Sequence, residues 1–546
     1  MAHTVAVGGE AGSGGSRYTV RAVMRVGWDR RRFRRACLAA VPPGLEQGTD
    51  AEREDEEQAD QAPARGREDA HGHGDATNLP AGPWLRQDAP RRGRATLQAR
   101  NATGDPPTPG TILPPMHSPA PRHVPRLLWL LALLGGPACG RRPALAVESA
   151  PGPADAFAES ADPALAVDPG TGDLLASFVA RGPGRPWQVY VTRSADGGSS
   201  WTTLRQVSMA DSGLKPQGEA SPRLVAGPGG RLAVVWVEEY RVPGRRWAAS
   251  RLRASRSADG GRTWSRAVTL NDDTTAADPA GAHLFHGAAW QGDSGLVVAW
   301  LDERRPAAFA AEQARTAADP GSAEEADATI YSVSSTDFGA TWGPNQARWP
   351  AACPCCRVTL AREPGGSVAG AWRQHFPGDV RDVVLARLPA GAGAAPAPAR
   401  VHEDGWVYPG CPYTGPALAV GDDGARHVAW YTGRPGGAGV FLARAGAPPL
   451  ALVTDSLLPS AHAALLPLAG GATLAAWDIA ADGSRRISAA HVAGAATAVR
   501  GVAVPGSEGG MQPQLAALGA GGAYLAWTRV TDGSRRVAGA RLRFPP

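Results

Sequence analysis

The chain contains 546 residues, among them 69 glycines and 49 prolines, and its formal net charge is +5. This length exceeds what one small hydrophobic core organises, so we expect either several domains or one body built from stacked repeats. The arginines are dispersed along the chain rather than gathered in one segment, which argues against a nucleic-acid partner.

The first 115 residues differ from the rest of the chain. They contain an arginine-rich segment at 30–35, an acidic stretch at 51–60 and no sustained hydrophobic periodicity. Low hydrophobicity with mixed charge predicts a disordered region. The alternative is that translation starts at Met116 and that residues 1–115 are not part of the protein.

Residues 116–146 are typical of an export segment. A basic stretch (122–126) precedes the apolar run LLWLLALL (127–134), which is too short to span a bilayer. The following GGPAC (135–139) resembles a bacterial lipoprotein cleavage site with Cys139 as the lipidated residue, although Gly136 stands where leucine is usual. An alternative cleavage follows residue 146. We therefore expect a periplasmic, cell-surface or secreted protein that contacts a membrane only through a lipid anchor.

From residue 163 onward one pattern recurs: an apolar strand, a glycine-containing turn, a second strand that ends in an aromatic residue, and a third, alternating strand. The seven second strands span 174–178, 232–236, 296–300, 368–372, 427–431, 473–477 and 523–527. Their aromatics lie 47 to 72 residues apart, near the period of a propeller blade. The aromatics are Phe178, Trp236, Trp300, Trp372, Trp430, Trp477 and Trp527.

Three units carry a second signature after the third strand: SADGGSSW (194–201), SADGGRTW (257–264) and STDFGATW (335–342). Each fits S-x-D-x-G-x-[ST]-W, in which the aspartate can accept backbone N–H groups, the glycine allows a positive φ and the tryptophan covers the turn. We assign this structural role to Asp196, Trp201, Asp259, Trp264, Asp337 and Trp342.

These signatures resemble the Asp-box (BNR) repeats of the sialidase (neuraminidase)-like superfamily, and the resemblance covers residues 147–546. It implies an all-β, six- or seven-bladed β-propeller, with seven blades favoured by the repeat count. The last unit ends at its third strand (536–544), and residues 144–148 could supply the missing fourth strand and close the ring. In this superfamily the Asp boxes lie opposite the active site, so they identify the fold and not the activity.

Charged and aromatic residues follow the second strands at the end of the channel where family members bind ligands. Sialidase chemistry needs arginines that grip a carboxylate, a tyrosine nucleophile activated by a glutamate, and an aspartate as acid/base. The catalytic candidates are Tyr240, Glu238 and Asp302. The candidate ligand-binding residues are Arg241, Arg304, Arg373, Arg434 and Arg529.

The family's first-blade motif, an aromatic followed by Arg-Ile-Pro, is missing from the first unit. Tyr240-Arg241-Val242-Pro243 resembles it but lies in the second unit. The sequence therefore favours an exported surface module that binds a glycan or protein at the channel mouth. A sialidase-type exo-glycosidase is the alternative, and a merely solvated rim of charges would also account for these residues. An alanine-rich insertion (306–329) on the same face is expected to begin with a short helix.

Four cysteines open two adjacent units at the same end of the channel: Cys353, Cys355 and Cys356 in ACPCCR, and Cys411 in YPGCPY. Disulfides are the usual state of cysteines in an exported protein. A thiolate metal site is the alternative, because four soft ligands suit a thiophilic cation. In either case we expect all four cysteines to form one cluster. No other cofactor is predicted.

Overall fold

The computed structural model describes residues 145–545, apart from 203–204, 209–212, 242–247, 274–280, 305–326, 445–447, 455–460, 482–483 and 520. In this part of the chain the only helical segments are the single turns η1 (Gly218–Ala220), η2 (Pro228–Gly230) and η3 (Ala469–Gly471). The predicted all-β class is confirmed. No helix within the described ranges is long and apolar enough to cross a membrane. The upstream region, Cys139, residues 242–243 and most of the 306–329 insertion lie outside the described residues.

The strands form successive four-stranded antiparallel units. The first three units are β2 (Glu159–Val167), β3 (Leu174–Arg181), β4 (Gln188–Ser194) and β5 (Arg205–Gln206); β6 (Arg223–Gly227), β7 (Arg231–Tyr240), β8 (Ala249–Ser257) and β9 (Val268–Thr269); β10 (His283–Gln291), β11 (Gly295–Asp302), β12 (Ala328–Ser335) and β13 (Gln346–Ala352). The next three are β14 (Thr359–Arg362), β15 (Val368–Phe376), β16 (Val380–Leu388) and β17 (Ala399–Arg400); β18 (Ala417–Val420), β19 (Arg426–Thr432), β20 (Gly439–Arg444) and β21 (Leu450–Thr454); β22 (Ala463–Pro467), β23 (Thr473–Ala481), β24 (Ser484–Val492) and β25 (Val502–Ala503). The last unit contains β26 (Gly510–Ala517), β27 (Gly522–Thr531), β28 (Ser534–Arg543) and β1 (Ala146–Ala150).

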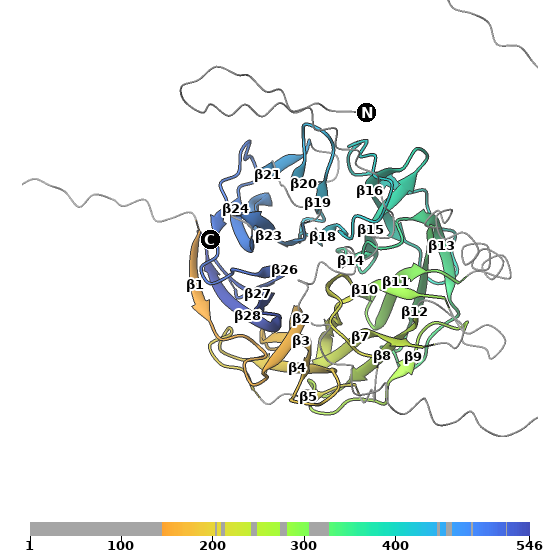
Figure 1. Ribbon diagram of the computed structural model, residues 1–546. Helices are drawn as coiled ribbons and strands as arrows, with labels where there is room; N and C mark the ends of the chain where they lie inside the picture. Colours follow the sequence, from red (N-terminus) through yellow and green to blue (C-terminus); the bar gives the residue numbers. More distant parts are fainter. Residues whose placement is uncertain are drawn as a thin grey trace, which may run out of the picture. The chain divides into compact units, whose positions relative to one another are not determined.

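The ring is closed by the two ends of the described chain. Strand β1 pairs antiparallel with β28, from Ala146↔Arg543 to Ala150↔Gly539, as the sequence predicted for residues 144–148. The innermost strands β2, β6, β10, β14, β18, β22 and β26 contact one another in succession, and β26 contacts β2 (Figure 1). A single bridge, Ala352↔Gln374, also joins the third and fourth units. Closure leaves no innermost strand without a neighbour in the next unit.

The core lies between the faces of adjacent sheets. The aromatics that end the second strands are almost fully buried, at 0–2% exposed. They belong to apolar clusters that each draw residues from neighbouring units. Replacement of one such tryptophan by alanine is expected to lower the free energy of unfolding by about 3–5 kcal/mol. The recurring aromatic is therefore the residue that packs each unit against the next.

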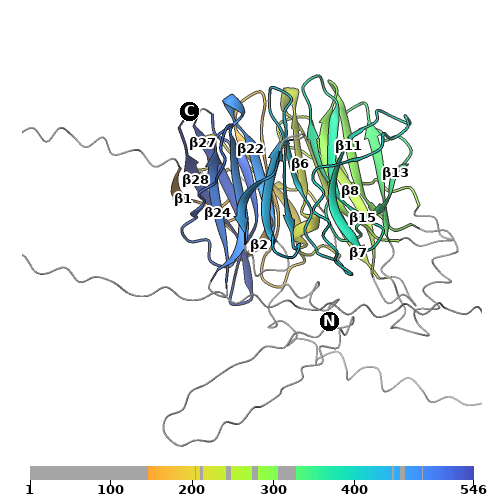
Figure 2. The ribbon, with the colours of Figure 1, turned by 90° about the horizontal axis from the view of Figure 1, so that it is seen from above.

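Each unit is an up-and-down meander, so its turns gather at two ends of the ring (Figure 2). The innermost strand begins at the same end at which the second strand turns into the third. We call this end the channel mouth. The first-to-second turns and the Asp boxes lie at the opposite end.

Candidate functional site

A buried polar residue stands at the start of most innermost strands. In three units it lies at a β-bulge, and the backbone there takes a positive φ of 58° at Asp162, 58° at Phe285 and 57° at Gln512. A bulge turns the side chain away from the regular alternation. The residues gathered at the mouth in this way are Asp162, Ser221, His286, Arg357, His462 and Gln512, all buried.

The Glu219 carboxylate, from η1, lies at the centre of this ring. It accepts hydrogen bonds from the backbone N–H of Arg357 (3.0 Å), the guanidinium of Arg357 (2.9 Å) and the backbone N–H of Gly415 (2.6 Å). The Nε2 atom of His462 lies 3.6 Å from the same carboxylate. Burial opposes ionisation, but Arg357 and His462 outweigh it and lower the pKa of Glu219. One side chain of the second unit thus joins the fourth, fifth and sixth units across the channel.

Asp478, which follows the β23 aromatic, orients His462. Its oxygens accept from the backbone N–H (2.9 Å) and Nδ1 (2.8 Å) of His462, from Arg485 (2.9 Å) and from the backbone N–H of Gln512 (2.8 Å). Despite complete burial, the charges of His462 and Arg485 hold the pKa of Asp478 well below its usual range. Glu219, His462 and Asp478 therefore form a continuous buried network.

The candidate catalytic carboxylates are hydrogen-bonded to other residues of their own units. Glu238 accepts the indole N–H of Trp236 (3.1 Å) and is bonded by Arg251 (3.2 Å). Asp302 accepts the indole N–H of Trp300 (2.8 Å) and the backbone N–H of Arg304 (2.8 Å). In each case the tryptophan is two residues earlier on the same strand face. Tyr240 is half-buried at the end of β7, with the Arg251 guanidinium 5.5 Å from its ring.

The candidate ligand-binding arginines differ in burial and in their partners. Arg373 is 1% exposed and donates to the carbonyls of Thr414, Arg381 and Tyr431. Arg304 is paired with Asp302, Asp272 and Asp273. Of the other three, Arg241 is exposed, Arg434 lies 3.4 Å from Asp404, and Arg529 is half-buried near the end of β27.

A second buried network surrounds His283 in the third unit. Its Nε2 lies 2.9 Å from Asp273 and 3.5 Å from Asp302, while Nδ1 lies 2.7 Å from the carbonyl of Ser250. Burial lowers the pKa of His283, but the two aspartates outweigh it, and the net shift is upward. Because both ring nitrogens face oxygen acceptors, the site suits an imidazolium.

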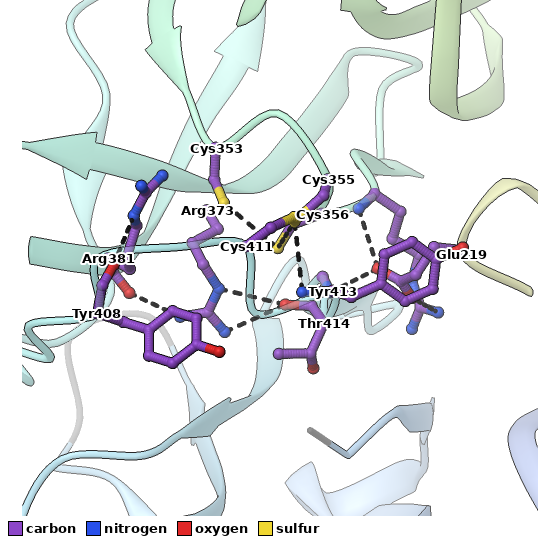
Figure 3. Close-up of a disulfide and its surroundings, with 12 residues drawn as sticks. Glu219, Cys353, Cys355, Cys356, Arg373, Arg381, Tyr408, Cys411, Tyr413 and Thr414 are labelled. Carbon is purple, nitrogen blue, oxygen red and sulfur yellow. Dashed lines mark hydrogen bonds and ion pairs between the residues drawn. A yellow bond between two sulfur atoms is a disulfide. The ribbon is translucent and has the colours of Figure 1, made fainter. Parts of the chain in front are cut away.

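The four cysteines of the two predicted motifs meet between the fourth and fifth units, and we call them the cysteine cluster (Figure 3). Cys355 and Cys411 form a disulfide with their Cα atoms 6.0 Å apart, within the usual range. Cys353 and Cys356 are thiols, and the Sγ of Cys356 lies 3.6 Å from that of Cys353 and 3.9 Å from that of Cys355. All four are at most 8% exposed.

The two thiols have different acidities. Burial disfavours the Cys353 thiolate, but a hydrogen bond from Cys356 and the nearby charges of Arg381 and Arg373 lower the pKa of Cys353 to about 7. Burial and the neighbouring sulfur raise the pKa of Cys356. The cluster therefore combines a disulfide with one acidic and one weakly acidic thiol.

The Asp boxes form compact hairpins at the other end of the channel. In the second unit Asp259 accepts the backbone N–H (2.9 Å) and hydroxyl (2.6 Å) of Thr263, and Ser257 accepts the backbone N–H of Gly261 (2.9 Å). Asp196 and Asp337 make the equivalent contacts in their units. The glycines have positive φ, 86° at Gly261. The tryptophans Trp201, Trp264 and Trp342 are half-buried over the turns.

The chain has a β-propeller fold, a closed ring of four-stranded antiparallel units. No protein-family model matches the sequence, and no curated protein matches it. Among solved structures, a protein of unknown function from Dyadobacter fermentans is similar with a TM-score of 0.42 and 14% identity, over 74% of this chain and 100% of the other. A Hadza microbial sialidase gives a TM-score of 0.38 at 14% identity, over 72% and 68% of the two chains. An α-L-arabinanase of Penicillium chrysogenum gives 0.39 at 14%, over 73% and 98%.

Sequence reasoning missed Glu219 and Arg357 and did not connect His462 with them. A signal was present, because Asp162, Ser221 and Gln512 each precede a proline at matching places in the repeat. Alignment of the repeats on these prolines would have indicated the ring of mouth residues. The partners across the channel have no such signal.

Proposed function

We propose that this chain is an exported, non-hydrolytic propeller that binds a glycan or protein ligand at the channel mouth. The observation that carries this proposal is that the candidate catalytic and ligand-binding groups are already hydrogen-bonded within the protein. Glu238 and Asp302 each accept an indole N–H and bond an arginine, and Arg373 donates to three carbonyls.

Sialoside hydrolysis requires these groups to be available to a substrate. A glutamate must activate the tyrosine nucleophile, an aspartate must exchange a proton with the leaving group, and arginines must form bidentate bonds to a carboxylate. Withdrawal of Glu238 or Asp302 from its present partners would leave a buried indole N–H unsatisfied, at a cost of about 1–3 kcal/mol. This cost supports a structural use of the two carboxylates.

Other side chains at the mouth remain accessible for binding. Lys215 and Arg251 are 57% and 44% exposed, and Arg251 lies over the half-buried ring of Tyr240. Tyrosine and arginine are enriched among residues that contribute most to binding, because each combines a flat contact surface with hydrogen-bonding groups. A pair of this kind suits the face of a sugar ring or a partner's polar surface.

The test combines a binding assay with a hydrolysis assay on the full chain. We expect glycan-array or partner-capture binding that falls about tenfold or more in the double variant Tyr240→Ala/Arg251→Ala, in line with loss of a tyrosine–arginine hot spot. The control is Arg262→Ala, an exposed arginine of the Asp box in the same unit. We expect no turnover of a fluorogenic sialoside. Turnover that disappears in Glu238→Gln or Tyr240→Phe would instead establish the exo-glycosidase.

A further inference from the structure

The cysteine cluster contains more sulfur than one disulfide uses. With Cys355 and Cys411 paired, two further thiols lie buried against the same disulfide. The Sγ atoms of Cys353, Cys355 and Cys356 all lie within 4.8 Å of one another. Cys411 contributes a fourth sulfur from the adjacent unit, bonded to Cys355.

The sulfur spacing fits a tetrahedral metal ion. A metal–sulfur bond of about 2.3 Å gives a tetrahedron whose edges are about 3.8 Å. The two Sγ–Sγ distances, 3.6 Å between Cys353 and Cys356 and 3.9 Å between Cys355 and Cys356, lie just below and just above that edge length. Separation of the Cys355 and Cys411 sulfurs by side-chain rotation would complete the set.

The backbone holds both segments in place. Cys353 donates its N–H to the carbonyl of Arg373 (2.9 Å), and Val358 donates to that of Phe285 (2.8 Å). The N–H of Tyr413 points at the Sγ of Cys355 (3.4 Å), the kind of outer contact that metal thiolates take. Preorganised ligands of this type bind a metal without a large ordering cost.

The surrounding charge suits an anionic metal–thiolate group rather than neutral thiols. Arg373 and Arg381 are 1% and 2% exposed and lie beside the cluster (Figure 3). The Nη1 atom of Arg381 is buried without a hydrogen-bond partner in the described part of the chain. Four thiolates carry two negative charges around Zn²⁺ and three around Cu⁺, and the two guanidinium groups would offset two of them. A buried charge needs such a counterion.

We propose that Cys353, Cys355, Cys356 and Cys411 bind one thiophilic d¹⁰ cation, Zn²⁺ or Cu⁺, at the channel mouth. The Cys355–Cys411 disulfide is the oxidised, metal-free form. Reduction by a dithiol breaks the disulfide, produces two thiols and converts the reductant to its cyclic disulfide. Binding then exchanges the four thiol protons for the metal ion. This site is independent of ligand binding at Tyr240 and Arg251.

The test uses the reduced full chain, loaded anaerobically in separate arms with Zn²⁺ or Cu⁺ and freed of excess metal. We expect one metal ion per chain in at least one arm, and a thiolate-to-metal absorption band when Co²⁺ is used as a reporter. Alkylation followed by mass spectrometry should label the four cysteines only after chelation. Cys356→Ser should lower affinity about tenfold or more. Arg262→Ala, at an exposed position in an Asp box at the opposite end of the channel, should not.

Three outcomes would overturn the proposal. The first is a reduced, folded protein that retains no metal in either arm. The second is equal alkylation of the cluster with and without chelator. The third is mass-spectrometric identification of Cys353–Cys356 and Cys355–Cys411 disulfides that re-form in the presence of metal. The Co²⁺ spectrum of the unmodified chain remains decisive if Cys356→Ser does not fold.

Discussion

Glu219 is expected to contribute strongly to stability because it joins several units across the mouth. Its side chain is fully buried and pairs with Arg357, which is 5% exposed. Removal of one partner of such a pair leaves an uncompensated buried charge, which costs about 3–5 kcal/mol. Glu219→Gln keeps the shape and one acceptor oxygen, so we expect a loss near the lower end, about 3 kcal/mol.

Equilibrium urea unfolding of the full chain at pH 7, followed by tryptophan fluorescence, measures this loss. Arg357→Met provides the second arm of a double-mutant cycle, and we expect a coupling energy of about 2 kcal/mol with Glu219→Gln. The matched control is Glu159→Gln, because Glu159 and Arg181 form an exposed pair at 36% and 38%. Such a pair contributes about 0–1 kcal/mol.

The pH dependence gives an independent check on Glu219. The pKa of Glu219 is lower in the folded chain than the ordinary value of 4.5. Its contribution is therefore complete above pH 4.5 and is lost as the pH falls through the folded pKa. Glu219→Gln should remove that part of the acid sensitivity. A loss below about 0.5 kcal/mol at pH 7, or additive single variants, would refute the cross-channel pairing.

Three further predictions concern other parts of the ring. Because the pKa of His283 is raised in the folded chain, protonated His283 stabilises the fold below pH 6.5, and this stabilisation is lost as the pH rises through the folded pKa. His283→Gln should therefore make the free energy of unfolding less dependent on pH in this range. An unchanged pH profile would contradict the prediction. Trp300→Ala should cost about 3–5 kcal/mol and the half-buried Trp264→Ala about half as much in urea unfolding, and equal losses would contradict the burial difference. An added Cβ at Gly198 would lie 2.3 Å from the Tyr524 ring, whereas at Gly172 it meets nothing within 4 Å. Thermal melting should therefore show a larger loss for Gly198→Ala than for Gly172→Ala, although both have positive φ.

The repeat architecture could be predicted from the sequence because each unit is specified locally. Alternation of apolar residues marks strands, and an aromatic at the end of each second strand, such as Trp236 or Trp477, marks the position that packs between sheets. The Asp boxes join residues only four apart, as between Asp259 and Thr263. The closing strand was also predictable, because the last unit lacks a fourth strand.

The roles of Glu238 and Asp302 were within reach of the sequence but were not predicted. Side chains two residues apart share one face of a strand, so Trp236 and Trp300 lie beside the carboxylates that follow them. The sequence pattern Trp-x-Glu/Asp therefore indicates a structural hydrogen bond. The family resemblance and the position after the second strands suggested an activating glutamate and an acid/base aspartate instead, because residue type does not report which groups are already bonded.

Only the tertiary structure decided what meets at the channel mouth. Glu219 bonds the backbone of Arg357, 138 residues away, and of Gly415, 196 residues away. Similarly, the cysteine cluster depends on the angle between the fourth and fifth units. The local pattern places each residue at the start of an innermost strand, but the direction and reach of its side chain across the channel depend on the closure of the whole ring. That closure is set by packing between all the sheets together, which no single repeat encodes.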